Sequence, residues 1–331
     1  MVRWGILGTA RINRRLVPAF KASQRGKLVA VASRNLARAA SHAREHGIAH
    51  AVQGYDTLLN DPAIDAVYIS LPNTEHVPWT LKAIAAGKHV LCEKPLALDP
   101  HDIDRIADAA ARAHVIVEEG FMYRHESMTA KVRSLLDDGA IGSVRAIASG
   151  FTFMLEGNAN IRLDRSLGGG ALWDIGCYPV TSAQLIAGHE PRLALGIAHW
   201  TTGGVDDEFM GMLHFDGDMT ASIYASFRAE HRTWLEVLGT KGVMTVPNPF
   251  RPGPLEHIEL ARGGKTERIP VEGSPLLFLR QVEDFEARIL DAAPAVVTLD
   301  ESRRTATTLV ALYQSADTHK NNNTETPRHG S

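Results

Sequence analysis

Short apolar runs alternate with amphipathic segments through the first third of the chain. Runs of consecutive apolar residues are typical of strands buried on both faces, and we expect such strands at residues 3–7, 27–33, 66–69, 89–92 and 115–118. Between them the spacing of apolar residues predicts helices at residues 12–23, 36–46, 74–86 and 99–114. Strands that alternate with helices in this way form a parallel sheet with right-handed crossovers.

Beyond about residue 120 the pattern changes. We expect a long strand at residues 143–153, a helix at residues 172–187, and further strands at residues 194–202, 208–215, 219–227 and 234–238. Turns that contain Gly and Asp separate these strands at short spacing, which indicates antiparallel pairing. Two more helices are expected, at residues 276–291 and 301–317.

Together these elements predict an α/β protein. Residues 1–120 are expected to form an N-terminal Rossmann domain with a doubly wound parallel sheet. Residues 121–317 are expected to form a C-terminal α+β domain with a large, mostly antiparallel sheet. Residues 318–331 are expected to form a polar tail.

Composition excludes several classes of protein. The 331 residues include 35 Lys and Arg against 38 Asp and Glu, so the charge gives no basis for binding nucleic acid or an anionic membrane. No apolar run reaches the length of a membrane-spanning helix, and no leader-like segment precedes the first expected strand. Because Cys92 and Cys177 are the only cysteines, we expect a cytoplasmic protein without a disulfide framework.

The most informative motif is Glu93-Lys94-Pro95, which follows the apolar run that ends at Cys92. Ligands of open α/β sheets lie beyond the carboxyl ends of the strands, so we expect Lys94 to face a bound cofactor. Pro95 restricts the backbone immediately after Lys94. From these residues alone, a solvated lysine on a surface loop is the alternative.

A loop of the phosphate-binding type joins the first strand to the first helix. Small residues there let the backbone approach a pyrophosphate, whose charge the helix N-terminus stabilises. The match to Gly-x-Gly-x-x-Gly is imperfect, because Ala10 and Asn13 stand where the second and third glycines fall. An ordinary strand–helix turn is the alternative. The expected cofactor contacts are Gly8, Thr9, Ala10, Arg11 and Ile12.

The end of the second strand indicates which dinucleotide is bound. NAD-specific sites usually carry Asp or Glu at this point to bind the ribose 2′-hydroxyl. Here the chain has Ser33-Arg34-Asn35, with Arg38 one turn further on. Since no carboxylate repels a 2′-phosphate and guanidinium groups bind phosphate well, we expect NADP rather than NAD. A solvated arginine pair at a helix start is the alternative.

A third motif is the segment GGGALWDIGCY at residues 168–178. Asp174 and Tyr178 are four residues apart at the expected start of a helix, so they would share one helix face. A tyrosine takes the proton of an alcohol when a nearby cation lowers its pKa, and Lys94 is a candidate for that cation or for the proton carrier itself. Asp174 would then orient the substrate or the lysine. An ordinary helix start with a core tyrosine is the alternative.

Several polar and aromatic residues near these motifs are candidate substrate contacts. They follow the last expected Rossmann strand or lie close to the triple glycine. Binding of substrate hydroxyls and internal packing or salt bridging explain them equally well. The candidates are Tyr123, Arg124, Asn160, Arg162 and Trp173.

The segment His42-Ala43-Arg44-Glu45-His46 matches the His-x-x-Glu-His string of one class of zinc protease. It lies on an expected helix rich in Ala and Arg, and the sequence suggests no third ligand. We therefore interpret it as a chance match and expect no metal site.

In order and spacing, these motifs resemble those of the glucose–fructose oxidoreductase / inositol dehydrogenase / rhizopine-catabolism (Gfo/Idh/MocA) family. The resemblance rests on the phosphate loop, the Leu71-Pro72-Asn73-Thr74-Glu75-His76 turn, Glu93-Lys94-Pro95 and the triple-glycine segment. It covers most of the chain. Within the family the chain is most similar to dihydrodiol dehydrogenases, NADP-dependent xylose dehydrogenases and sugar ketoreductases.

The resemblance implies that residues 1–120 form an NADP-binding Rossmann domain and that residues 121–317 serve substrate binding and oligomerisation, with the open face of their sheet mediating homodimers or homotetramers. It implies that Lys94 is catalytic and that Tyr178 is the acid–base residue, a position at which inositol dehydrogenases have histidine. It also places a further set of residues beside the cofactor, namely Leu71, Pro72, Asn73, His76 and Glu93.

We therefore expect an NADP-dependent oxidoreductase. The expected reaction transfers a hydride between the nicotinamide and a carbinol or carbonyl carbon of a sugar, sugar derivative or diol, with Tyr178 and Lys94 handling the proton. One alternative is a non-catalytic NADP(H)-binding sensor or partner protein. Another is transient oxidation with a tightly held cofactor, as in an epimerase or a glycosidase.

Overall fold

The computed structural model describes residues 1–157 and 160–324. The described chain divides into two compact units, each assembled from separate stretches of sequence. The first unit comprises residues 1–131, 251–256 and 271–303, and the second comprises residues 132–250, 257–270 and the chain from residue 304. The functional division at residues 120 and 317 stays a prediction.

The first unit is built on a six-stranded sheet in the order β3-β2-β1-β4-β5-β6, in which all neighbours are parallel. The strands are β1 (Val2–Leu7), β2 (Gly26–Ser33), β3 (His50–Gln53), β4 (Ala66–Ile69), β5 (His89–Glu93) and β6 (Val117–Gly120). The helices between them are α1 (Asn13–Ala22), α2 (Leu36–His46), α3 (Tyr55–Leu59), α4 (Asn73–Ala85) and α5 (Pro100–Ala113). This order confirms the predicted doubly wound sheet.

Strand β1 lies at the centre of this unit. Its Trp4, Ile6 and Leu7 are completely buried, as expected for a strand covered on both faces. The Trp4 indole N–H donates to Glu286 Oε1 at 2.9 Å. Glu286 lies on α8 (Leu279–Asp291), so a helix 282 residues further along the chain completes this core.

Two elements of the first unit have no counterpart in the sequence-based expectation. Strand β3 is an edge strand of four residues, all of them at least partly exposed, so it lacks the apolar run that identifies a buried strand. Helix α3 has only five residues, too few to show a helical period. Strand β6 begins two residues later than expected because α5 is followed by His114, whose φ of 54° turns the chain away from the helix.

An eight-stranded sheet dominates the second unit, in the order β14-β13-β12-β11-β7-β10-β9-β8. Its strands are β7 (Val144–Thr152), β8 (Leu193–Trp200), β9 (Asp206–His214), β10 (Thr220–Ser226), β11 (Arg232–Gly239), β12 (Val243–Val246), β13 (Leu255–Arg262) and β14 (Lys265–Glu272). Only the β7–β10 pair is parallel among those whose register the described residues define, which confirms the predicted mostly antiparallel sheet. The last three strands were not expected from the sequence.

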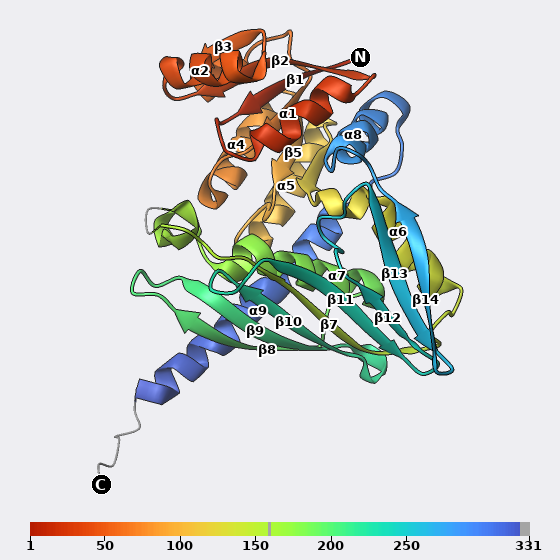
Figure 1. The fold of residues 1–331 in the computed structure, drawn as a ribbon. Coiled ribbons are helices and arrows are strands. Elements are labelled where there is room, and N and C mark those ends of the chain that lie inside the picture. The colour runs from red at the N-terminus through yellow and green to blue at the C-terminus, as the bar shows by residue number, and fades with distance from the viewer. Residues whose placement is uncertain (158–159, 325–331) are drawn as a thin grey trace. The chain divides into compact units, whose positions relative to one another are not determined.

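Helices cover one face of this sheet (Figure 1). Helix α7 (Cys177–Ala187) lies against β7 and β10. Helix α9 (Leu299–Thr324) approaches β8 and β9 through two glycines, since a Cβ at Gly196 would lie 2.5 Å from Leu312 O and one at Gly211 would lie 3.0 Å from the Leu312 side chain. Small residues in the strands therefore set the depth at which this helix packs.

Shorter segments connect these elements. Helix α6 spans Ser127–Asp137, and 3₁₀ turns lie at Met122–His125, Ile161–Leu163, Arg165–Leu167 and Asp216–Asp218.

Helix α9 continues beyond its expected end at residue 317 to Thr324. No Pro or Gly interrupts the sequence there before Pro327, so no residue breaks the helix. The rest of the expected polar tail, residues 325–331, lies outside the described residues. Within the described chain no helix, α9 included, is both long and apolar enough to cross a bilayer.

Candidate active site

The carboxyl edge of the parallel sheet carries most of the predicted cofactor residues. The strand order changes direction between β1 and β4, the point at which doubly wound sheets bind their ligands. The ladder continues past both strand ends, because Gly8 N donates to Ala32 O and Ser70 N donates to Leu7 O, each at 3.0 Å. The loops after these strands therefore begin side by side.

Gly8 is required by the backbone geometry of the first loop. Its φ is 107°, and a Cβ at this position would lie 3.0 Å from the carbonyl oxygen of Ser70. A residue with a side chain would be strained here and would fill the space that a closely approaching ligand needs.

The loop after Gly8 leads into a helix start that suits an anion. Within the described chain no side chain caps α1, and its first turn contains no acidic residue. Asn13 Nδ2 donates to Gly8 O at 3.0 Å, so the residue that replaces the third glycine of the motif is buried and folds the loop back onto itself. The other predicted contacts, Thr9, Ala10, Arg11 and Ile12, are partly or fully exposed.

The predicted 2′-phosphate residues lie at the start of α2. Ser33 ends β2 and is buried, whereas Arg34 and Arg38 are exposed. Asn35 caps the helix, its side-chain oxygen accepting the Arg38 N–H at 3.1 Å. Among the described residues neither arginine forms an ion pair, so both guanidinium groups are available to a phosphate.

The Glu93-Lys94-Pro95 motif begins where β5 ends. Glu93 is the last residue of the strand and accepts a hydrogen bond from the hydroxyl of Tyr68 on β4. Lys94 is half-buried and precedes a cis peptide bond to Pro95. The backbone N–H of Leu96 donates to buried Glu119 at 2.8 Å. Side chains of two neighbouring strands therefore hold the segment on both sides of the lysine.

His76 links this segment to the loop after β4. Its Nδ1 lies 2.7 Å from Pro95 O and its Nε2 lies 2.8 Å from Leu71 O. The ring is almost completely buried, and this burial lowers its pKa. His76 thus lies between Leu71 and the residue that follows Lys94. The predicted cofactor residues Leu71, Pro72 and Asn73 are all half-buried.

In the second unit, the triple glycine packs closely onto the backbone before it. Gly169 N donates to Asp164 O and Gly170 N to Arg162 O, both at 2.9 Å, and a Cβ on Gly169 would lie 2.5 Å from Arg162 O. The helix that follows opens with a π-helical turn at Leu172–Gly176 before α7 begins. This corrects the expectation of one regular helix from residue 172, and such turns are frequent at functional sites.

Two of the predicted site residues of this unit form an ion pair. Arg162 Nε donates to Asp174 Oδ2 at 2.5 Å, so the salt bridge of Arg162 goes to Asp174 and not to the nearer acids in sequence. Asn160 accepts the Arg162 N–H at 3.1 Å and so orders the same turn. Tyr178 is buried, with Phe151 and Phe250 centred 5.4 Å and 5.5 Å from its ring.

The remaining substrate candidates are enclosed within their own units. Tyr123 is buried, and Arg124 pairs with Glu301 at 2.7 Å and donates to Val296 O at 3.1 Å. Trp173 is buried with its ring centred 5.4 Å from that of Tyr313. Their predicted role as substrate contacts stays a prediction.

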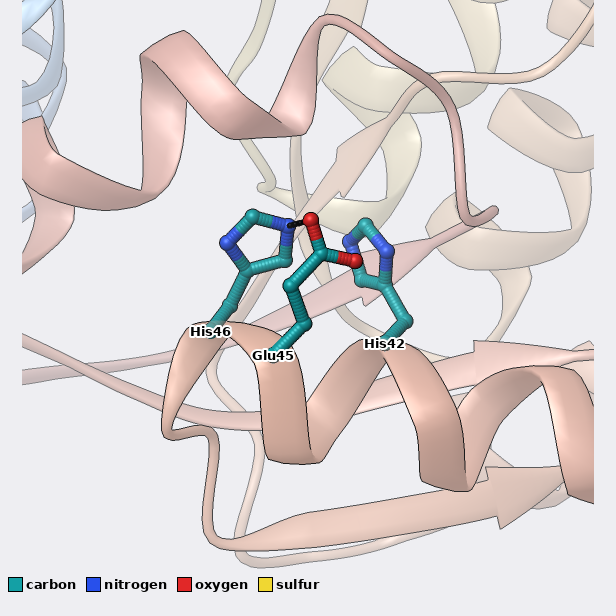
Figure 2. Close-up of side chains that lie close together, drawn as sticks. All are labelled: His42, Glu45 and His46. Atoms are coloured by element: carbon teal, nitrogen blue, oxygen red, sulfur yellow. Dashed lines mark ion pairs between the residues drawn. The ribbon is translucent and has the colours of Figure 1, made fainter.

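Figure 2 shows His42, Glu45 and His46 projecting from the same side of α2. One possible ligand atom from each lies within 4.8 Å of the others. Each has a protein neighbour, however: His42 Nε2 lies 3.1 Å from Asn13 Nδ2, and Glu45 lies 3.3 Å from Arg14 Nε and 3.8 Å from His46 Nε2. Contacts to α1 thus account for the arrangement, and the expected lack of a metal stays a prediction.

Sequence patterns did not identify every residue that supports the site. Tyr68 and Glu119 belong to the buried strands β4 and β6. Asp206, which accepts the Leu172 N–H at 2.8 Å, lies at the start of β9. No motif marks them, because their partners are distant in sequence.

Comparison with known proteins identifies the two parts of the chain separately. A family model described as "Oxidoreductase family, NAD-binding Rossmann fold" matches residues 2–121, and a "GFO/IDH/MocA C-terminal domain" model matches residues 129–245. The "D-xylose 1-dehydrogenase (NADP(+)) 2" of Haloferax volcanii is 36% identical over 95% of this chain and 97% of its own. A "dTDP-3,4-didehydro-2,6-dideoxy-alpha-D-glucose 3-reductase" of Streptomyces violaceoruber is 36% identical over 92% and 86%.

Among solved structures, a 3-ketoreductase from Actinomadura kijaniata in complex with NADP and TDP-benzene has a TM-score of 0.90. It is 29% identical, and the match covers 95% of this chain and 97% of that one. Variants of that enzyme in which a lysine is replaced by Ala or Glu, or a tyrosine by Phe, have also been crystallised with both molecules.

We expect His76→Leu to lower the free energy of unfolding by about 1 to 3 kcal/mol, because a buried carbonyl oxygen would lose the imidazole N–H that it accepts. Urea denaturation followed by circular dichroism measures this change. The matched control is His101→Leu, since His101 has a largely exposed side chain in the same unit. Equal stability of the two variants would show that the His76 bridge contributes nothing.

Proposed function

Because the chain belongs to the Gfo/Idh/MocA oxidoreductase family, we propose that it is an NADP-dependent enzyme acting on CH–OH groups. The reaction we propose moves a hydride between the nicotinamide and a carbinol or carbonyl carbon of a sugar, sugar derivative or diol. The relatives' names support this substrate class, since they refer to D-xylose and to a deoxygenated keto sugar carried on dTDP.

The carboxyl edge of the first unit fits a dinucleotide. Gly8 leaves the space that a Cβ would fill, the start of α1 suits a pyrophosphate, and exposed Arg34 and Arg38 suit a 2′-phosphate. When bound, NADP supplies or accepts the hydride. The other residues that we propose to contact it are Thr9, Ala10, Arg11, Ile12, Ser33, Leu71, Pro72, Asn73, Glu93 and Lys94.

We assign His76 an indirect part in this. Both of its ring nitrogens already face backbone oxygens, so it positions the Leu71 loop and the Pro95 carbonyl and leaves ligand contact to their neighbours.

The acid–base residues we propose are Tyr178 and Lys94. The Tyr178 phenol would exchange the proton of the substrate hydroxyl, and the Lys94 ammonium would stabilise the phenolate that forms. In the Actinomadura ketoreductase the replaced lysine and tyrosine are separated by the same number of residues as Lys94 and Tyr178. Asp174, held by Arg162, would orient the substrate.

One observation carries the proposal: the lysine stands at the carboxyl end of β5, beside Glu93, on the edge that doubly wound sheets use for their ligands. A sensor that only binds NADP(H) has no use for an acid–base group, and transient-oxidation chemistry leaves no net change in the cofactor. A panel of sugars and diols, assayed by nicotinamide absorbance, separates these alternatives from the proposed reaction.

We further propose that the chain forms a homodimer or homotetramer through the open face of the second sheet. Five large apolar side chains are exposed there, Leu193, Leu195, Ile197, Met210 and Met212. They lie on neighbouring strands, with Leu195 opposite Met212 and Ile197 opposite Met210. A contiguous apolar surface of this kind is typical of a protein–protein interface.

We expect Lys94→Met and Tyr178→Phe each to lower kcat by about a hundredfold or more, because each removes a proton-handling group. The Kd for NADP should change by less than about threefold, because neither Lys94 nor Tyr178 is among the residues that we propose to bind its phosphate groups. Steady-state kinetics on a substrate from the panel and a fluorescence titration of NADP measure the two effects. Controls are Lys82→Met and Tyr224→Phe, and undiminished turnover in both test variants would remove the assignment.

Cofactor choice is tested by Arg34→Asp. We expect NADP to bind about ten- to a hundredfold more weakly, because charge-assisted hydrogen bonds to the 2′-phosphate are lost, and NAD to bind more tightly, because a carboxylate can accept the ribose hydroxyl. Isothermal titration of both dinucleotides gives the ratio. Arg44→Asp, an exposed change on α2, should leave this ratio unchanged. A wild-type protein with equal affinity for both dinucleotides would contradict the role of Arg34.

The interface is tested by the double substitution Ile197→Glu and Met212→Glu. We expect it to yield a monomer in sedimentation velocity at micromolar concentration, because it places charges in an apolar contact. Circular dichroism should be unchanged, since both side chains are exposed in the single chain. Leu290→Glu on α8 is the control. A variant that keeps the wild-type sedimentation coefficient would exclude this face.

A further inference from the structure

A buried carboxylate holds the start of the turn that carries the proposed catalytic residues of the second unit. Asp206 is the first residue of β9 and is completely buried. Its Oδ2 accepts the N–H of Leu172 at 2.8 Å. Leu172 opens the π-helical turn that leads through Asp174 to Tyr178.

The second oxygen of this carboxylate is held by a residue of α9. The hydroxyl of Tyr313 donates to Asp206 Oδ1. The carboxylate is therefore bound at both oxygens, one by a backbone N–H of the turn and the other by the phenol. These contacts join distant parts of the sequence, because Asp206 is 34 positions from Leu172 and Tyr313 is 107 positions from Asp206.

The last glycine before the turn, Gly170, lies so close to Asp206 and Tyr313 that no side chain fits there. Gly170 has a φ of 131°, and a Cβ on it would lie 2.4 Å from Asp206 Oδ1 and 2.6 Å from the Tyr313 hydroxyl. Its own carbonyl oxygen accepts the N–H of Asp174 at 3.0 Å. The third glycine of the motif is thus explained by close contact with Asp206 and Tyr313.

We infer that Asp206 and Tyr313 are positioning residues that fix the turn from Gly170 to Asp174, and thereby the placement of Asp174 and Tyr178. This inference rests on the proposed function for its effect on catalysis, but the contacts belong to the second unit alone. Neither residue touches a reacting atom in this scheme. Both act through the backbone, where a shift of about an ångström at a catalytic group can cost about a hundredfold in rate.

The pair also gives the turn a dependence on pH. Burial raises the pKa of Asp206 to about 6, and the other charged groups that act on this pair are Asp207 on β9 and Asp317 on α9. A protonated carboxyl cannot accept hydrogen bonds at both oxygens as the carboxylate does. Because the folded pKa lies above the unfolded one, protonation stabilises the fold as pH falls through about 6. A loss of activity below this pH through Asp206 is therefore local and not an unfolding effect.

The test compares Asp206→Asn with Asp207→Asn, its neighbour on the same strand, and Tyr313→Phe with Tyr224→Phe. Asparagine resembles the protonated carboxyl at every pH. We expect Asp206→Asn to lower kcat about tenfold or more at pH 7.5, with the difference from wild type shrinking toward pH 5, and to leave the Kd for NADP unchanged. Hydrogen–deuterium exchange at the amide of residue 172 should be faster in Asp206→Asn and Tyr313→Phe than in both controls.

The double variant of Asp206→Asn and Tyr313→Phe should lose no more activity than Asp206→Asn alone, because the two residues act as one unit. Tyr313→Phe keeps the ring that packs on Trp173 and Phe209, so it provides the test if Asp206→Asn does not fold. Unchanged amide exchange in both single variants overturns the inference, as does a kcat loss that is equal at pH 5 and pH 7.5. A wild-type protein that turns over no member of the panel refutes the proposed function instead, and the exchange measurement still decides the positioning role.

Discussion

Parallel pairing of β1, β2, β4 and β5 is the constraint on which the candidate site depends. Parallel strands end at a common edge, so loops that are far apart in sequence must begin next to one another. This edge receives Gly8, Ser33, Ser70 and Lys94. The reversal of strand order between β1 and β4 separates the connecting helices there and leaves their N-terminal ends facing a ligand. The chemistry of the first unit is a consequence of that arrangement.

Loops at such an edge can place binding groups accurately only if their backbone is fixed. Buried polar side chains fix the backbone in both units. In the first unit His76 joins Leu71 O to Pro95 O, across two loops. In the second unit Asp206 binds the N–H of Leu172 at the start of the turn, and Tyr313 holds the other oxygen of this carboxylate. Leaving such groups unpaired in a buried site costs more than a hydrogen bond contributes in water, so these contacts restrict the backbone strongly.

Under the proposed function the two units contribute different chemistry. The first offers a phosphate-binding helix start, two exposed arginines and an ammonium group, all suited to the charges of NADP. The second offers a phenol in an aromatic setting and a carboxylate paired with Arg162. The pKa of an ordinary tyrosine is about 10, so under this proposal a cation is needed to make Tyr178 a useful acid and base near neutral pH.

The sequence by itself determined the parallel class of the first sheet, the order of its buried strands and of the longer helices between them, and the place of the main motifs. These follow from local information: apolar runs, helix periods, and glycines where the backbone must turn, as at Gly8. Tertiary structure decided the features that depend on contacts between residues distant in sequence. The edge strand β3 carries no apolar run, the ion pair of Arg162 selects Asp174, and Asp206 and Tyr313 have no motif at all. These features arise from burial and hydrogen bonding between residues that folding alone brings together, and local periodicity contains no record of such partners.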